Sequence, residues 1–382
     1  MLKKRFSIVT VIIACICSCG LVIAALIYGL QSVTGSLPGT FKFLRALSIV
    51  RGSFIENVDY NKLYEGAIKG MVNALGDPYS VYLDDESFKS LMTSTEGHFG
   101  GIGVVIGMKD SNFVVIAPLK GTPGERAGIK SGDKITAIDG KKSAGQTLED
   151  VVAQIRGKEG TSVEIELKTA AGEAKTVRVI RSDIKLETVA GEMKNNKIGY
   201  IRISMFNEST GSDFIKKFHE LEGQGMEGLV LDLRDNPGGL LSESVKVAEL
   251  MVPKGPIVSV TEKSGKSVTE YSNLEKTKYP VAVIVNQGSA SAAEIVAGAL
   301  QDTQAGKLFG TKTFGKGSVQ AVSNLDESTG MKLTIAHYYT PSGRSINGTG
   351  IEPDVVVEPT GEMGENQLNT AISYLEKELA KK

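Results

Sequence analysis

The sequence predicts a mixed α/β fold built from several parts. Residues 228–233 and 281–285 are near-continuous apolar runs, and segments with helical periodicity lie around them. Short apolar runs of this kind are typical of strands buried on both faces of an α/β layer structure. Residues 96–182 differ, because short alternating segments separated by glycine turns predict a smaller β-rich part. An N-terminal apolar run precedes both parts and is long enough to cross a bilayer.

The first 35 residues predict a cytoplasmic tail and a membrane anchor. Lys3, Lys4 and Arg5 precede an almost entirely apolar stretch from Ser7 to Leu30. The basic cluster favours an N-terminus inside the cell, with the rest of the chain outside. We therefore expect an uncleaved, single-pass signal anchor in the cell membrane and an extracytoplasmic location for the remainder. A cleaved signal peptide is the alternative, and a lipid anchor at Cys19 fits less well because the apolar run continues past it.

The composition excludes several kinds of catalytic and metal-binding site from the exported part of the chain. Cys15, Cys17 and Cys19 are the only cysteines and lie in the apolar run, so thiol catalysis, cysteine-ligated metals and disulfides are excluded beyond it. The net charge is -1, which gives no reason to expect a nucleic-acid partner. Asp232 and Asp235 are close in sequence, but no further metal-ligand motif accompanies them. We expect neither a metal nor an organic cofactor.

Residues 36–95 predict an N-terminal helical region. Apolar side chains recur at helical spacing from Leu63 to Leu75, and Gly-Asp-Pro at 76–78 ends the pattern. Residues 31–41 are rich in Gly, Ser, Thr and Gln and predict a tether. At the other end of the chain, residues 361–382 predict a charged amphipathic helix suited to an oligomer contact.

Residues 96–182 resemble a PDZ domain of the bacterial type. A glycine turn at 100–106 runs into a strand, and the stretch Ala-Gly-Ile-Lys-Ser-Gly-Asp occupies residues 127–133. The resemblance implies that backbone amides of one loop capture a peptide C-terminus while the peptide adds as a strand. That loop comprises Gly101, Ile102, Gly103 and Val104. Around it we expect strands at 113–117, 134–138, 163–167 and 176–180, and a helix at 148–155.

Residues 183–360 alternate strands and helices and predict the α/β core. We expect strands at 199–203, 228–233, 257–260, 281–285, 308–310 and 331–339, and helices at 209–222, 240–251 and 291–304.

The strand at 281–285 leads into the segment Asn-Gln-Gly-Ser-Ala-Ser-Ala-Ala-Glu at 286–294. A serine at a strand-to-helix turn lies where free N–H groups and the helix dipole stabilise a negative oxygen. Position alone does not choose between Ser289 and Ser291. A helix N-cap is the ordinary alternative for such a serine.

A serine nucleophile needs a base, and Lys316 is the better candidate. Glycines flank this lysine, and burial by apolar neighbours would lower its pKa toward the neutral form that a base requires. Gln320 follows four residues later and offers a hydrogen bond without adding charge. His337 is the reserve base, but no Gly-x-Ser-x-Gly elbow supports a histidine triad. A surface lysine in a glycine turn is the alternative reading of Lys316.

Two further glycine motifs bear on function. Residues 310–316 nearly match a phosphate-binding P-loop, but Gly317 replaces the required Ser or Thr and a strand follows instead of a helix. The motif at 232–239, Asp-Leu-Arg-Asp-Asn-Pro-Gly-Gly, follows a buried strand and opens a helix. Its free amides suit an oxyanion hole, and a tight turn that needs glycine is the alternative.

These motifs together resemble those of carboxyl-terminal processing (tail-specific) proteases. The match comprises the segments at 75–80, 232–239, 288–294 and 313–320 in the family's order, and it covers about residues 42 to 360. The resemblance implies a ClpP/crotonase-like protease core and a homodimer built through the terminal helices. It implies the following residue roles: Ser291 as nucleophile, Lys316 as base, Gln320 to orient the lysine, the amides of Ala292 and Gly238 as oxyanion donors, and Arg156 to couple peptide binding to activation.

Two other functions compete with a serine endopeptidase. A non-catalytic, membrane-tethered PDZ adaptor would use the α/β part as a scaffold, but it would not need Ser291, Lys316 and Gln320 together. A serine hydrolase of another substrate class, such as an esterase, would keep these residues, but a PDZ domain argues for peptide substrates.

Overall fold

The computed structural model describes residues 8–109, 112–119, 121–169, 172–195, 197–361 and 364–381. Lys3, Lys4 and Arg5 lie outside these ranges. The chain divides into two compact units, one up to Ala74 and one from Leu75 onward.

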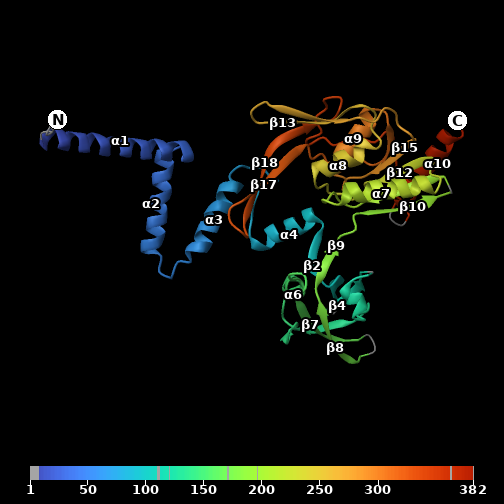
Figure 1. Ribbon diagram of the computed structural model, residues 1–382, viewed down its shortest axis with the longest axis horizontal. Coiled ribbons are helices and arrows are strands. Elements are labelled where there is room, and N and C mark those ends of the chain that lie inside the picture. The colour runs from blue at the N-terminus through green and yellow to red at the C-terminus, as the bar shows by residue number, and fades with distance from the viewer. Residues whose placement is uncertain are drawn as a thin grey trace, which may run out of the picture. The chain divides into compact units, whose positions relative to one another are not determined.

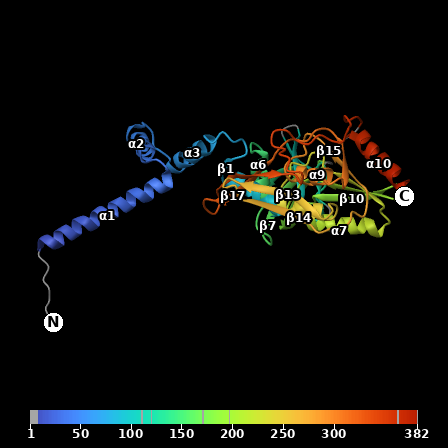
Figure 2. The same cartoon turned by 90° about the horizontal axis from the view of Figure 1, so that it is seen from above.

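The first unit consists of helices α1 (Ile8–Thr34), α2 (Leu37–Ser53) and α3 (Tyr60–Asn73) (Figures 1 and 2). In α1, residues Ile12–Thr34 have a mean hydropathy of 2.5 and exposed side chains, so the helix is long and apolar enough to cross a membrane. The predicted tether at 31–41 is wrong, because only Gly35 and Ser36 separate α1 from α2. The Ser36 hydroxyl accepts from the Gly39 N–H and so caps α2.

The core of the second unit is a six-stranded sheet in the order β10-β11-β12-β15-β16-β19. Strand β10 is antiparallel to β11, and the other neighbours are parallel. The strands are β10 (Val189–Lys194), β11 (Ile198–Ile203), β12 (Gly228–Asp232), β15 (Val281–Val285), β16 (Gly306–Gly310) and β19 (Val355–Val356).

Helices cover both faces of this sheet (Figure 1). Val281, Val283 and Val285 of β15 pack into one apolar cluster with α7 (Thr210–Gly223), α8 (Leu241–Glu249) and α9 (Ala292–Asp302). Ala282 and Ile284 pack into another with α10 (Glu365–Leu379). Alternate side chains of a strand point to opposite faces, so an uninterrupted apolar run is what a doubly covered strand requires. The mixed α/β prediction is confirmed.

A second sheet has the order β1-β18-β13-β14, and β17 pairs with β18. It is antiparallel throughout. The strands are β1 (Val81–Leu83), β13 (Gly255–Glu262), β14 (Ser267–Ser272), β17 (Ser318–Asn324) and β18 (Gly330–Tyr339). Helix α4 (Asp85–Glu96) follows β1, capped by Asp84 and ended by Gly97 in the left-handed conformation.

Strands β2 (His98–Gly101) and β9 (Ser182–Lys185) pair with each other. The residues between these two strands form the β-rich part. Its sheet has the order β3-β4-β5-β7-β8, so β3 is an edge strand, and β6 pairs with β5. The elements are β3 (Val104–Lys109), β4 (Asn112–Pro118), α5 (Pro123–Arg126), β5 (Lys134–Ile138), β6 (Lys141–Lys142), α6 (Leu148–Ile155), β7 (Ser162–Lys168) and β8 (Ala174–Ile180). A Thr147–Asp150 capping box starts α6 at the predicted residue.

Candidate active site

Ser291 lies at the turn between the carboxyl end of β15 and helix α9. Its backbone has φ 54° and ψ -117°, a conformation that costs a non-glycine residue about 1–3 kcal/mol. The Glu294 carboxylate accepts from the Ser291 N–H at 2.9 Å, and the Tyr338 hydroxyl donates to the Ser291 carbonyl at 3.1 Å. These contacts hold a strained serine at the edge of a cleft that its side chain lines.

Ser289 differs in its surroundings. It is fully buried, its hydroxyl donates to the Leu233 carbonyl at 2.7 Å, and it accepts from the Asn286 N–H at 3.0 Å. The Ser289 hydroxyl therefore uses both its donor and its acceptor, and it connects the loop after β12 to the loop after β15. Of the two serines, Ser291 alone lines the cleft.

Lys316 follows β16 in the loop that leads into β17, and it also lines the cleft. Its ammonium lies over the Tyr79 ring, 5.0 Å from the centroid. Burial, and then the positive charge of Lys332, lower the pKa of Lys316, while Asp77 and Glu294 oppose this shift. The net direction increases the neutral fraction at any given pH.

Glu294 was not a predicted site residue, yet it connects the serine turn to the lysine loop. The side chain is fully buried. Its Oε2 accepts from the N–H groups of Ser291 and Lys316, and its Oε1 accepts from the Gly315 N–H at 2.8 Å and the Thr313 hydroxyl at 2.6 Å. Four donors thus satisfy a buried carboxylate that forms no ion pair in the part of the chain that the structure describes.

The cleft has a volume of about 480 Å³. Its wall is mainly apolar and comes from α4, the 205–206 and 237–241 segments, α9, β17 and β18. Such a surface suits apolar side chains of an extended ligand. The lining residues include Leu91, Met92, Met205, Phe206, Pro237, Leu240, Leu241, Ile295, Val319 and Val322.

Two lining residues have unused backbone donors. Within the described residues, the N–H groups of Ala292 and Gly239 donate no hydrogen bond, and both residues line the cleft. The Gly238 N–H instead donates to the Asn236 side chain at 2.9 Å. A Cβ on Gly238 would lie 2.7 Å from the Ser291 Cβ, so glycine is needed for this close approach.

Gln320 lines the cleft, but it does not contact Lys316 directly. Its Nε2 donates to Ser318 Oγ at 2.8 Å and to Thr334 Oγ1 at 3.3 Å. The Lys316 ammonium makes no hydrogen bond to Ser291 or Gln320 in this structure. Hydrogen bonds between reacting groups are often long before substrate binds. The reserve base His337 is exposed and does not line the cleft.

The loop before β3, which the sequence predicts to bind a carboxylate, turns through a glycine in the left-handed region. Gly103 has φ 69°, and the N–H groups of Ile102 and Gly103 donate no hydrogen bond within the described part of the chain. Gly101 ends β2, and Val104 begins the edge strand. Arg156 caps α6 and lies over the Phe99 ring at 4.4 Å. Burial lowers the pKa of Arg156, whose Nε has no hydrogen-bond partner among the residues that the structure describes.

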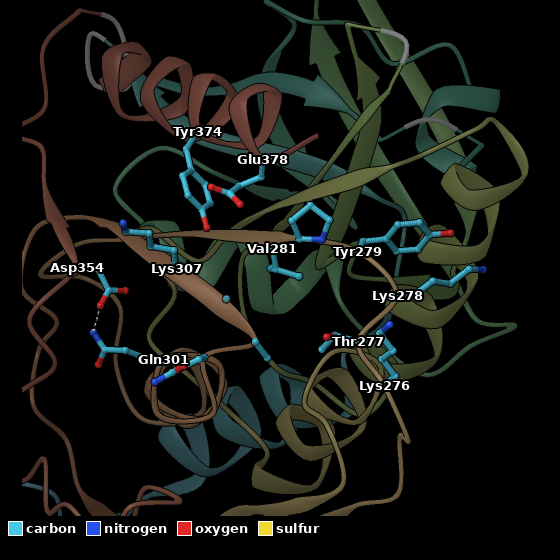
Figure 3. A pocket seen from close by; sticks show the side chains of 14 residues that line it. Lys276, Thr277, Lys278, Tyr279, Val281, Gln301, Lys307, Asp354, Tyr374 and Glu378 are labelled. Carbon is cyan, nitrogen blue, oxygen red and sulfur yellow. Dashed lines mark hydrogen bonds between the residues drawn. The ribbon is translucent and has the colours of Figure 1, made fainter. Parts of the chain in front are cut away.

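A second cavity, of about 580 Å³, lies at the amino ends of β15 and β16 (Figure 3). Lysines and carboxylates line it together, among them Lys307, Asp354 and Glu378. In open α/β sheets, ligands bind outside the carboxyl ends of the strands, which is where Ser291 lies. Among the described residues, no group of three His, Cys, Asp or Glu side chains could hold a metal ion.

Comparisons with known proteins agree with this architecture. Residues 197–357 match Peptidase family S41, residues 30–87 match the Activating protease CtpB N-terminal domain, and residues 114–169 match the PDZ domain. Carboxy-terminal processing protease CtpA of Bacillus subtilis is 40% identical over 319 residues, which are 83% of this chain and 68% of the relative. The carboxy-terminal-processing protease of Bartonella bacilliformis is 40% identical over 349 residues, covering 88% and 80%. A solved structure assigned to the S41 proteases, from Bacteroides fragilis, shares the fold with a TM-score of 0.51 at 17% identity, covering 86% of this chain and 96% of that one.

Proposed function

Because this chain belongs to the S41 family of carboxy-terminal processing serine proteases, we propose that it cleaves peptide bonds with Ser291 as nucleophile and Lys316 as general base. The observation that carries the assignment is that both side chains line one cleft while Glu294 binds the backbone of both. A base needs a neutral amine, and the pKa of Lys316 is lowered by burial and by Lys332.

The reaction proceeds in two halves. Neutral Lys316 Nζ takes the proton from Ser291 Oγ, which attacks the scissile carbonyl carbon. The resulting ammonium gives its proton to the leaving amine as the peptide bond breaks, which leaves an acyl-enzyme. Water then gives a proton to Lys316 as its oxygen attacks the ester carbonyl carbon. The ammonium returns that proton to Ser291 Oγ as the ester C–O bond breaks, and the acyl product leaves as a carboxylic acid.

Backbone amides stabilise the tetrahedral oxyanion. The Ala292 N–H is one donor, at the amino end of α9, where the helix dipole adds to the effect. The second comes from the glycine pair at 238–239. The sequence motif favours Gly238, but its N–H is engaged by Asn236. Gly239, whose N–H is free and whose backbone lines the cleft, is the donor that we assign in this arrangement.

Gln320 orients the amine of Lys316 once substrate binds. Its amide now bonds Ser318 and Thr334, and a change of side-chain rotamer would turn its oxygen toward the lysine. A neutral acceptor aligns the lone pair of Lys316 without raising its pKa as a carboxylate would.

The PDZ domain binds the C-terminus of the substrate. The free amides of Ile102 and Gly103 hold the carboxylate, Gly101 and Val104 frame the loop, and the peptide pairs with edge strand β3. Arg156, at the end of α6 and stacked on Phe99, couples an occupied groove to the protease.

The remaining assignments concern location and assembly. Helix α1 anchors the chain in the cell membrane as an uncleaved single-pass segment, with the protease extracytoplasmic. The parts are the anchor (1–35), the helical region (36–95), the PDZ domain (96–182), the protease core (183–360) and the C-terminal helix (361–382). A homodimer forms through the terminal helices. Alkaline extraction of membranes and light scattering in detergent test the anchor and the dimer.

One experiment separates the protease from the adaptor. The full chain, purified in mild detergent, is incubated with an unstructured protein and with peptides that have apolar C-termini. Wild type is expected to cleave, and the Lys316→Met variant is expected to bind the peptides without cleaving them. Peptide binding with no cleavage by wild type would favour the adaptor, and cleavage by Lys316→Met would sink the assignment of the base.

A further inference from the structure

The charges that line the catalytic cleft are all positive. Among the residues that the structure describes, Lys316 and Lys332 are its only charged lining residues, and no Asp or Glu side chain lines it. Lys316 has a role in the proposed function, in which it must be neutral. Lys332 therefore supplies the permanent positive charge of the cleft. The proposed function uses Lys332 only through its effect on the pKa of Lys316 and gives its ammonium no contact with the substrate.

Strand pairing fixes the place of Lys332 relative to Gln320. In the β17–β18 ladder, Gln320 is opposite Thr334 and Val322 is opposite Lys332. Directly opposed residues share a face of the sheet, as do residues two apart on one strand. Lys332 thus lies on the same face as Gln320, roughly 7 Å further along the hairpin. Gln320, Val322 and Lys332 all line the cleft.

Lys332 is a partly buried lysine without an ion pair. No carboxylate among the described residues lies within ion-pair distance of its ammonium. In the open cleft, water solvates the ammonium. A peptide that fills the cleft displaces this water, and a buried charge without a partner is costly. The favoured substrate is one that brings its own anion.

We infer that Lys332 forms a carboxylate subsite, which binds an acidic group of the substrate within about two residues of the scissile bond. The offset of roughly 7 Å is measured from Gln320 along the hairpin and corresponds to about two residues of an extended peptide at about 3.3 Å per residue, with the scissile bond taken to lie beside Gln320. The inference rests on the proposed function, since it assumes that Ser291 marks the scissile bond. An Asp or Glu side chain, or the C-terminal carboxylate of a substrate cut near its end, supplies the same chemistry.

A simpler role would be purely electrostatic, with Lys332 acting only on Lys316. That role changes the rate of every substrate by the same factor, whereas a carboxylate subsite changes the ratio between acidic and neutral substrates. The ratio of two kcat/KM values at one pH is therefore the decisive quantity.

The test uses the full chain in detergent and fluorogenic peptides that differ only as Glu or Gln at one position, up to two residues on either side of the scissile bond. A further pair ends two residues beyond that bond with a free or an amidated C-terminus. Four proteins are compared: wild type, Lys332→Met, Lys332→Arg and Lys307→Met. Lys307 is a matched control, because it is also a partly buried lysine on a strand but lines the second cavity.

Wild type is expected to prefer one acidic peptide over its Gln partner by about tenfold. Lys332→Met is expected to reduce that preference to about twofold or less, while Lys332→Arg and Lys307→Met keep it. The peptide position at which the preference occurs distinguishes a side chain from a chain terminus. No preference in wild type, or a preference that survives Lys332→Met, overturns the inference while leaving the protease assignment intact.

Failure of the proposed function is recognised separately, as no cleavage of any peptide by wild type. In that case the amidated peptides are labelled and their binding to the same four proteins is followed by fluorescence anisotropy. Tighter binding of a Glu peptide that Lys332→Met abolishes supports the subsite without any turnover, and equal binding of the Glu and Gln peptides overturns it.

Discussion

The backbone N–H groups of Ser291 and Lys316 donate to one oxygen atom, Glu294 Oε2, and both distances are 2.9 Å. A single buried carboxylate thus sets the distance between two loops that come from different strands. The Tyr338 hydroxyl donates to the carbonyls of the same two residues. The proposed nucleophile and base are therefore held together through their backbones, and their side chains remain free to exchange a proton.

Replacement of Glu294 by Gln is expected to damage both stability and catalysis. A side-chain amide has one acceptor oxygen and one NH₂ group that only donates, so two of the donors now bound to the carboxylate would face that NH₂ group. Two unsatisfied buried donors cost about 2 to 6 kcal/mol, and a displaced lysine loop is expected to lower kcat on the order of 100-fold. Chemical denaturation and peptide cleavage measure the two effects.

A matched control for this change is Glu243→Gln. Glu243 is also a buried carboxylate on a helix, where it accepts from the Gly211 N–H and pairs with Lys246, but it does not accept from the Ser291 or Lys316 backbone as Glu294 does. It is expected to lower stability with little change in kcat. Wild-type kcat in folded Glu294→Gln would show that the carboxylate does not position the reacting groups.

The two serines of the turn are expected to separate stability from activity. Ser291→Ala removes the proposed nucleophile and is expected to reduce kcat by a factor on the order of 10⁴ or more, with the melting temperature retained. Ser289→Ala removes two buried hydrogen bonds and is expected to cost about 1–2 kcal/mol of unfolding free energy while kcat stays near wild type. The reverse pattern would reassign the nucleophile to Ser289.

The sequence predicts an element correctly where a single local pattern determines its secondary structure and burial. The apolar run at 281–285 predicted a doubly covered strand, and β15 has those limits. The tether at 31–41 failed for a local reason as well. Its composition suggests a flexible segment, but Ser36 caps α2, so only two residues interrupt the helices.

The parts of the site that the sequence did not predict depend on contacts between segments that are far apart in the sequence. Glu294 belongs to the motif at 288–294, but a Glu on a helix is usually solvated. It becomes part of the site only because the loop at 313–316 folds against it and donates hydrogen bonds to its carboxylate. Lys332 looks like an ordinary strand lysine until the β17–β18 register places it beside Gln320. The choice between Gly238 and Gly239 likewise depends on which amide Asn236 occupies.

The PDZ loop allows a test in which only the space around a glycine differs. Gly103 and Gly121 have φ angles of 69° and 73°, but a Cβ on Gly103 would lie 2.4 Å from Thr122, while nothing lies within 4 Å of one on Gly121. Gly103→Ala is expected to weaken binding of C-terminal peptides at least tenfold, measured by fluorescence anisotropy. Gly121→Ala should cost about 1 kcal/mol of stability and leave binding unchanged. Equal effects of both changes would remove the loop from peptide recognition.

The pH dependence of cleavage should move in opposite directions in two variants. Lys316 acts as a base only when neutral, so kcat rises with pH until the lysine has lost its proton. Lys332 lowers the pKa of Lys316, and Asp77 raises it. Lys332→Met is therefore expected to raise the pKa of Lys316 and shift the rising limb to higher pH. Asp77→Asn is expected to lower that pKa and shift the limb to lower pH.

The other groups near Lys316 are not expected to cause these shifts in the pH dependence of kcat. Glu294 also raises its pKa but is unchanged in both variants, and Tyr79 contributes a ring face without a formal charge. Asp77→Asn keeps an oxygen for the Tyr79 N–H, which donates to the carboxylate at 3.2 Å. Shifts of the same sign in both variants would mean that loop distortion, and not charge, controls the lysine. No shift in either would exclude Lys316 as the group that titrates in kcat.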